Sequence, residues 1–175
     1  MEKLFEKNLK EGRRLEEAVK NCLKKRLIGY EVSVTDQEKD SPERETYSLV
    51  DVIVREWDGR PVLGVECKLS ETKYEACMKR NGWDGDVNTP LNNTSLHEYK
   101  KASFPFYIVN INTWCHRAFA ADIPTILNSK NDAGRNVKKS GVIIYNIDSS
   151  SWMSWEGDFT ITDILTDILK KEGIC

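Results

Sequence analysis

The sequence predicts one α/β domain, residues 1–175, in which helices flank a mixed central sheet. Three observations carry this prediction. Apolar residues recur with helical spacing over 12–27, β-branched residues form a hairpin pattern over 48–68, and further apolar runs of strand length occupy 104–111 and 141–147. Helices and strands that alternate along a chain favour the α/β class, and 175 residues can bury one core.

The first helix is predicted by an apolar stripe whose members lie three or four residues apart. They are Leu15, Ala18, Val19, Cys22 and Leu23. Glu16 lies about 90° from the centre of this stripe, at ~100° per residue, on the flank shared with Val19 and Leu23. Glu16 therefore stands at the border of the buried face, where it either reaches into the protein or pairs with Lys20 at i+4.

The hairpin places two acidic residues side by side. The dipeptide Asp58-Gly59 is a strong turn signal between β-branched runs. If these two residues form the loop, Trp57 pairs with Arg60, and the same register continued along both strands sets Asp51 opposite Glu66. Directly opposed carboxylates repel each other, so this register requires something to compensate their charge.

Lys68 lies two residues beyond Glu66 and therefore on the same face as the acidic pair. A divalent cation beside it would accept both carboxylates as oxygen ligands. The opposite face of the hairpin is apolar and carries Val50, Val52, Val54, Leu63, Val65 and Cys67. Nearly continuous apolar strands predict a sheet covered on both sides.

The remaining elements follow from local patterns. A strand is expected over 30–35 and a polar loop over 81–94, which would be either a binding loop or a simple insertion. Helical segments are expected over 72–80, in part over 119–127, and over 161–171. The last of these has apolar residues spaced to dock on the sheet, namely Ile161, Ile164, Leu165, Ile168 and Leu169.

Asp51 together with Glu66-Cys67-Lys68 resembles the core motif of the PD-(D/E)XK nuclease superfamily, which includes restriction endonucleases and Holliday junction resolvases. In that motif an acid near the start of one strand is followed by acid-x-Lys on the next, and Val50 stands here in place of the proline. The stretch from Gly12 to Glu16 is similar to the Gly-x-x-hydrophobic-Glu sequence that many members carry on the first helix. The resemblance covers residues 10–112 by motif and element order.

This resemblance implies a restriction endonuclease-like αβββαβ core, followed here by an extra strand and a C-terminal helix. It also implies a metal-dependent nuclease that hydrolyses phosphodiester bonds, with DNA as the expected substrate. Asp51 and Glu66, with Glu16 and the backbone carbonyl of Cys67, would hold Mg²⁺ or Mn²⁺. Lys68 would position the attacking water or neutralise the charge of the transition state.

Two other interpretations stay open. The chain could be a catalytically inactive nucleic-acid-binding or assembly domain of the same fold, although the complete set of acid and acid-x-Lys argues against a degenerate site. Alternatively, Asp51, Glu66 and Lys68 could form a structural ion-pair network. This second interpretation predicts no affinity for Mg²⁺ or Mn²⁺ and little change in stability when Asp51 becomes asparagine.

A formal net charge of -2 does not favour a protein that coats nucleic acid, so contacts with DNA would come from local basic groups. The candidates are Lys100 with Lys101, and Arg135 with Lys138 and Lys139. A solvated loop is the alternative explanation for each group. A homodimer is compatible with the resemblance, but no interface pattern in the sequence decides the subunit number.

No stretch of the sequence approaches the ~20 apolar residues of a membrane span, and the N-terminus reads as a charged helix rather than a secretory signal. We therefore expect a cytoplasmic protein without a membrane partner. The five cysteines are odd in number and show no Cys-x-x-Cys spacing, which favours reduced thiols over disulfides or a zinc site.

Overall fold

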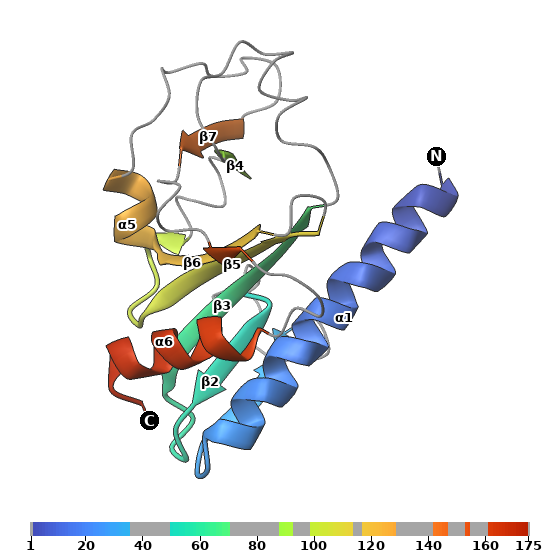
Figure 1. Ribbon diagram of the computed structural model, residues 1–175. Coiled ribbons are helices and arrows are strands. Elements are labelled where there is room, and N and C mark those ends of the chain that lie inside the picture. The colour runs from blue at the N-terminus through green and yellow to red at the C-terminus, as the bar shows by residue number, and fades with distance from the viewer. Residues whose placement is uncertain are drawn as a thin grey trace.

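A six-stranded mixed sheet forms the centre of the computed structural model (Figure 1). The structure describes residues 2–35, 50–70, 88–92, 99–113, 117–128, 142–146, 153–154 and 161–174. The strands of the sheet are, in spatial order, β1 (Glu31–Val34), β2 (Val52–Arg55), β3 (Pro61–Ser70), β5 (Phe106–Asn112), β6 (Arg117–Asp122) and β8 (Met153–Ser154). β3 and β5 run parallel and the other neighbours are antiparallel, so the predicted mixed α/β class is confirmed.

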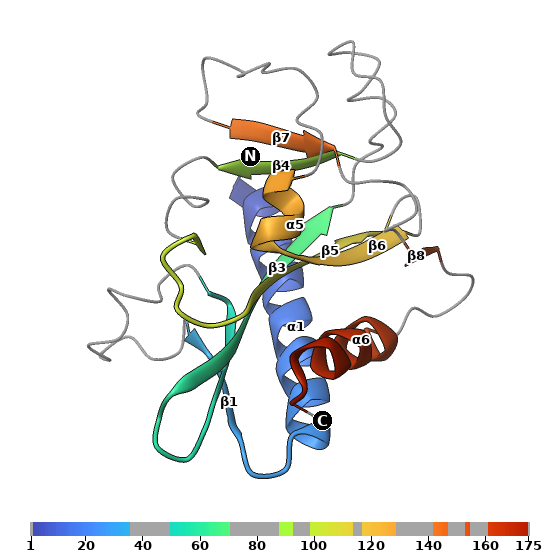
Figure 2. The ribbon, with the colours of Figure 1, turned by 90° about the vertical axis from the view of Figure 1, so that its left-hand side faces the viewer.

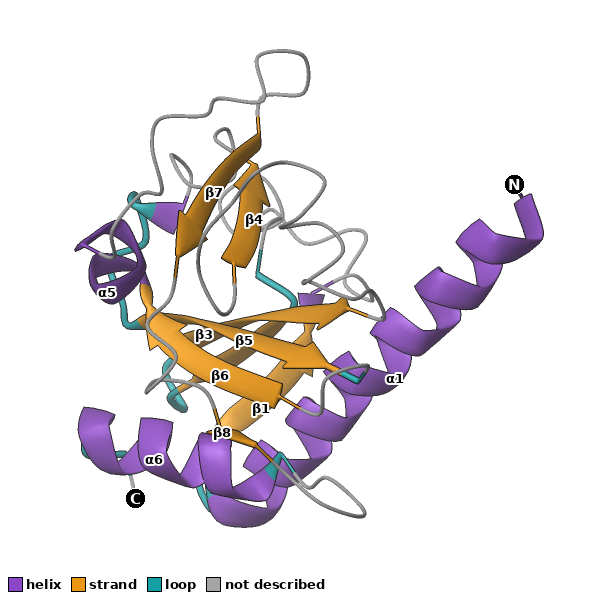
Figure 3. Cartoon of the chain, turned by 45° about the horizontal axis from the view of Figure 1, so that its top comes forward, coloured by secondary structure: helices purple, strands orange, loops and turns teal. Residues whose placement is uncertain are grey.

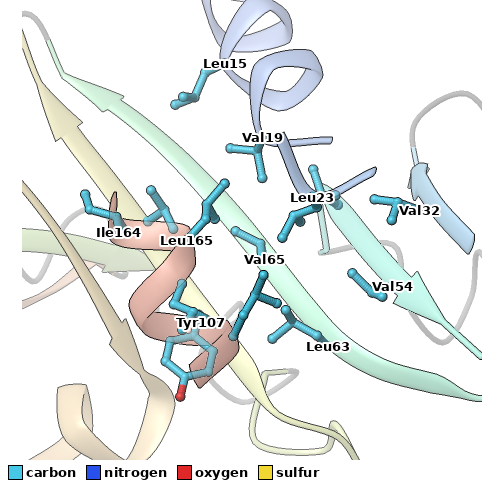
Figure 4. Packing of buried hydrophobic residues seen from close by; sticks show 14 of the residues in the cluster. Leu15, Val19, Leu23, Val32, Val54, Leu63, Val65, Tyr107, Ile164 and Leu165 are labelled. Atoms are coloured by element: carbon cyan, nitrogen blue, oxygen red, sulfur yellow. The ribbon is translucent and has the colours of Figure 1, made fainter. Parts of the chain in front are cut away.

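Helices α1 (Glu2–Arg26) and α6 (Thr162–Glu172) cover one face of the sheet (Figures 1 and 3). Figure 4 shows Leu15, Val19 and Leu23 of α1 and Leu165 of α6 beside apolar side chains of β2 and β3. The opposite face is covered by α5 (Ile123–Asn128) and by the segment 99–104. The sheet is therefore buried on both sides, as its apolar strands predict.

Helix α1 differs in two ways from the prediction. It begins at Glu2 rather than near Gly12, because residues 2–11 are rich in strong helix formers. Its buried row is Leu15, Val19 and Leu23, continued by Leu27 directly after the helix, whereas Ala18 is exposed. On a helix, residues four apart differ by about 40° in direction around the axis, so the centre of this row lies between Val19 and Leu23. Ala18 points about 120° away from that centre.

The face assigned to Val50 also needs correction. Val52, Val54, Leu63 and Val65 pack against α1 and α6 as predicted, but Val50 packs with Phe104 and Phe106 on the opposite face. The backbone bends at Asp51, just before β2 begins, and this bend breaks the alternation of side chains that the sequence pattern assumes.

Several elements of the second half differ from expectation. The expected loop 81–94 contains strand β4 (Asn88–Asn92), which pairs with β7 (Val142–Asn146) in a separate two-stranded sheet. Strand β6 occupies residues expected to be partly helical, and the helix α5 begins only at Ile123. The final helix matches its prediction, while the helix expected over 72–80 lies outside the described residues.

Strand β6 shows tertiary context overriding local propensity. Its sequence contains Ala118, Ala120 and Ala121, which favour a helix. The segment instead pairs along its whole length with β5, and Phe119 fills the core without exposure to solvent. The helix starts where Asp122 accepts a hydrogen bond from the backbone N–H of Thr125 at 2.7 Å, a typical N-terminal cap.

We expect Gly64→Ala to destabilise the protein by about 2 kcal/mol, a typical cost of overpacking a core. A Cβ at this position of β3 would lie 2.8 Å from Phe104 and 3.0 Å from Phe106. Urea unfolding would measure the change. Gly12→Ala is the matched control, because a Cβ there meets nothing within 4 Å and replaces a glycine inside α1, so it should stabilise by about 0.5–1 kcal/mol. Equal stability of Gly64→Ala and wild type would contradict this packing.

Candidate metal and phosphodiester site

The β2–β3 hairpin has a different turn from the predicted one. The backbone N–H of Glu56 donates to the carbonyl of Arg60 at 2.9 Å, and that of Gly59 donates to the carbonyl of Glu56 at 2.9 Å. The loop therefore contains three residues, 57–59, rather than two. Gly59 has a φ of 84°, which suits the left-handed position at the end of such a loop.

A bulge at Val62 offsets this longer turn. Arg55 pairs with Pro61 and Val54 pairs with Leu63, so Val62 is an extra residue on β3. Beyond the bulge, Val52 pairs with Val65, which is the register that sets Asp51 beside Glu66. The predicted juxtaposition is confirmed, although the predicted turn was wrong.

Backbone hydrogen bonds hold Asp51 from both neighbouring strands. Its carboxylate Oδ2 accepts the backbone N–H of Cys67 at 2.7 Å. Its carbonyl accepts the backbone N–H of Thr35 at 3.1 Å, and the Thr35 hydroxyl donates to the carbonyl of Val50. Asp51 is thus fixed between β1 and β3 although it precedes the regular part of β2.

Glu66 is buried with only one of its oxygens satisfied. Its side chain is on β3, where the residue is 5% exposed, and Lys68 Nζ donates to Oε1. The other oxygen, Oε2, is buried and accepts no hydrogen bond from the described residues. A buried carboxylate oxygen without a donor is costly, and a cation would satisfy it.

Burial and the neighbouring Glu66 raise the pKa of Asp51 to about 7. The Cys67 N–H and the Lys68 ammonium act in the opposite direction but do not outweigh them. A hydrogen bond from protonated Asp51 to Glu66 also raises this pKa. Asp51 therefore holds a proton near neutral pH when no cation is bound.

The surroundings of Lys68 keep its side chain charged. Burial lowers the pKa of this lysine, but the charges of Glu66 and Asp51 and the hydrogen bond to Glu66 more than reverse that effect, so the pKa is raised. The side chain is 41% exposed, which leaves the ammonium accessible beside the carboxylates. In this state Lys68 is a positive charge rather than a base.

Glu16 does not join Asp51 and Glu66 in a ligand cluster. The described residues contain no group of three His, Cys, Asp or Glu side chains that could hold a metal ion. Burial raises the pKa of the Cys67 thiol, and the charges of Asp51, Glu66 and Glu16 add to this effect. Because the Cys67 side chain packs in the cluster beneath α1 and α6, Glu16 acts on the site from that side of the sheet.

Asn110 is a polar neighbour of the site that the sequence interpretation missed. It pairs with Lys68 across the parallel β3–β5 ladder and is 1% exposed, and Asn112 is equally buried two residues further on. Both side chains share the face of Glu66 and Lys68. The available signal was two amides at alternate positions of an otherwise apolar strand, a pattern that is unusual in a buried strand.

The two predicted basic groups have different outcomes. Lys100 and Lys101 are exposed and follow Tyr99, which packs on the face of the sheet that carries the acidic pair. Arg135, Lys138 and Lys139 lie outside the described residues.

No family model, curated protein or solved structure matches this chain. The site therefore has to be interpreted from its own residues. Within the described ranges, every helix is too short or too polar to cross a membrane.

The pKa of Asp51 predicts an unusual dependence of stability on pH. Because the pKa is about 7 in the fold against 3.8 in a model compound, the folded protein binds more protons than the unfolded chain between these values. The metal-free protein should therefore lose up to roughly 4 kcal/mol from this group as the pH rises from 4 to 8. Urea unfolding in EDTA at several pH values would measure this loss. The control Asp163→Asn removes an exposed carboxylate and should show the same loss as wild type. A free energy of unfolding that rises between pH 4 and pH 8 in both proteins would contradict the prediction.

Proposed function

We propose that this protein is a metal-dependent nuclease that hydrolyses phosphodiester bonds, with DNA as its substrate and Asp51, Glu66 and Lys68 as its catalytic residues. The observation that carries the proposal is the acidic pair itself. Two carboxylates lie side by side in a largely buried position, and the one ammonium that the structure places beside them satisfies a single oxygen of Glu66. Lys68 alone does not compensate two ionised carboxylates, and a divalent cation would take the place of the proton that Asp51 holds near neutral pH.

The chemistry of these residues fits a hard divalent cation. Mg²⁺ and Mn²⁺ prefer carboxylate oxygens, and Mg²⁺ is commonly bound through one or two carboxylates together with water and substrate phosphate. Asp51 and Glu66 would supply the carboxylates, and Glu66 Oε2 is buried without a hydrogen-bond donor among the described residues. The carbonyl of Cys67 stays a predicted additional ligand, whereas Glu16 does not join the two carboxylates in a ligand cluster.

The order of the strands supports a restriction endonuclease-like core. β1, β2 and β3 form an antiparallel meander, and β5 then runs parallel to β3. A parallel neighbour requires a crossover connection between β3 and β5. The acid-x-Lys strand lies at the centre of this arrangement, flanked by the strand that follows Asp51.

A bound Mg²⁺ or Mn²⁺ would lower the pKa of a coordinated water and offset negative charge on the phosphate. In the hydrolysis, water attacks phosphorus, the bond to the leaving ester oxygen breaks, and that oxygen takes up a proton, which gives a phosphate monoester and a hydroxyl group. Asp51 is held rigidly by the Cys67 N–H, so its second oxygen keeps a fixed direction. Lys68 contributes its positive charge to the developing negative charge on the phosphoryl oxygens.

Cleavage of labelled single-stranded, duplex and branched DNA in Mg²⁺, Mn²⁺ or EDTA tests this function. We expect cutting that depends on metal and is absent in EDTA. Lys170→Ala is a control whose cleavage activity should persist, because this exposed lysine lies on α6, on the opposite side of the sheet from the acidic pair. Absence of cleavage in every arm, together with no metal binding by calorimetry, would overturn the proposal and favour a binding or assembly domain. Metal binding without cleavage would likewise refute catalysis.

A further inference from the structure

A groove with a volume of about 660 Å³ runs along the outer edge of β1. β1 is the end strand of the central sheet in the described part of the chain, and Figure 2 shows it between the hairpin and α1. The lining residues are Lys20, Lys24, Tyr30, Glu31, Val32, Ser33, Val34 and Trp57. Five of them are consecutive, and because successive strand residues point to opposite faces, the groove follows the edge of β1 rather than either face.

The groove combines aromatic rings with positive charge. Trp57 at the hairpin tip is 90% exposed, and its indole Nε1 lies 3.6 Å from the position of a Cβ at Gly29, over the turn that leads into β1. Tyr30 supplies a second ring. Lys20 and Lys24 are four residues apart and so project from the same side of α1, with Lys20 also bonded to Glu17 at 2.7 Å. Glu31 is an opposing charge within the lining.

One end of the groove lies next to the acidic pair. Val34, the last lining residue of β1, pairs with Val52, and the following residue donates its N–H to the carbonyl of Asp51 at 3.1 Å. The groove thus ends about one strand spacing, ~4.8 Å, from the backbone that carries Asp51. Its strand-lined length of roughly 13 Å fits up to about four stacked nucleotides at ~3.4 Å each.

We propose that this groove binds a single-stranded segment of the substrate, whose unpaired bases stack on Trp57 and whose phosphates meet Lys24 and Lys20. This inference rests on the proposed nuclease function and narrows its substrate to nucleic acid with a single-stranded part. Stacking on an exposed ring requires bases that are free of a partner strand, which a continuous duplex does not offer. The exposed tryptophan, the lysines and the path towards Asp51 favour a nucleic acid over a peptide strand added to β1.

The test is fluorescence anisotropy with a labelled thymidine oligomer of about 20 nucleotides in EDTA, which removes any need for the metal site. We expect Trp57→Ala and Lys24→Glu each to weaken binding about tenfold, and wild-type affinity to fall steeply between about 50 mM and 200 mM salt. Ile28→Ala is the control for the tryptophan, since it is 93% exposed at the adjacent turn but does not line the groove. Lys25→Glu makes the same charge change as Lys24→Glu outside the groove, and both controls should stay within about threefold of wild type.

Affinity that is unchanged in Trp57→Ala, or equal losses in Lys24→Glu and Lys25→Glu, would overturn the inference. Binding of the matching duplex as tightly as the oligomer would overturn it too. The failure of the nuclease proposal is a separate result. Oligomer binding that depends on Trp57, without any metal-dependent cleavage, would refute catalysis but support binding in the groove. Cleavage of duplex DNA that is unchanged in Trp57→Ala would support catalysis but refute binding in the groove.

Discussion

Replacing Asp51 by asparagine is expected to abolish metal-dependent cleavage and, at the same time, to stabilise the metal-free protein at pH 8. The loss of a carboxylate ligand removes several kcal/mol of charge stabilisation, which corresponds to about a thousandfold in rate. The gain in stability arises because asparagine removes a buried charge and its repulsion with Glu66, the two main causes that raise the pKa of Asp51. Its amide oxygen can still accept the Cys67 N–H, and its NH₂ group can donate to Glu66 Oε2.

Urea unfolding in EDTA would measure a gain of about 2 kcal/mol at pH 8 and little difference from wild type at pH 5, where the native carboxyl is already protonated. Glu66→Gln provides the contrast, since it also removes a ligand but deprives Lys68 of its anionic partner, so its gain should be smaller. Little change in the stability of Asp51→Asn relative to wild type at pH 8, together with no metal binding, would instead support the structural ion-pair network.

The second large effect is expected at Lys68. Lys68→Met keeps the apolar stem and removes the charge, and we expect cleavage to fall by about 100- to 1000-fold because the transition state loses an electrostatic partner. Metal affinity should rise at pH 8, since Lys68 no longer competes for the carboxylates. Below pH 7 this gain should shrink, because Lys68 lowers the pKa of Asp51 and its removal favours the proton.

Single-turnover cleavage and calorimetric titration with Mn²⁺ would separate the two consequences of Lys68→Met. Lys170→Met is the matched control, an exposed lysine of α6 whose loss should change neither quantity by more than about twofold. Parallel loss of metal binding and cleavage in Lys68→Met would indicate that the lysine holds the carboxylates in place rather than acting on the substrate.

The acidic pair could be predicted from the sequence because its determinants are local. Asp51, Glu66 and Lys68 are linked by one hairpin, and the alternation of apolar residues fixes which face each side chain occupies. The prediction of the turn was wrong, but the bulge at Val62 restored the register. The longer turn and the bulge each add one residue to the hairpin, and a turn signal alone cannot determine where such a residue is placed.

The features that the sequence could not predict depend on distant parts of the chain. β4 and β7 pair across about fifty intervening residues, and no local sequence pattern predicts that pairing. Alanine-rich β6 is a strand because β5 offers it a partner. Asn110 becomes a neighbour of Lys68 only through the parallel ladder between β3 and β5, and the position of Glu16 depends on how α1 crosses the sheet.

The bulge at Val62 separates two parts of the hairpin that can change independently. Residues 57–59 lie beyond the closing pair, so codons could be inserted there without altering which residues of the arms oppose each other. Inserting one residue between Leu63 and Glu66 would instead turn Glu66 and Lys68 towards α1 and bring Cys67 to the acidic side, because a second extra residue on β3 shifts its pairing with β2 by one. The tip that carries Trp57 is thus a part of the molecule where the proposed substrate preference could be changed by length as well as by sequence, while an insertion in β3 beyond the bulge would displace the acidic pair.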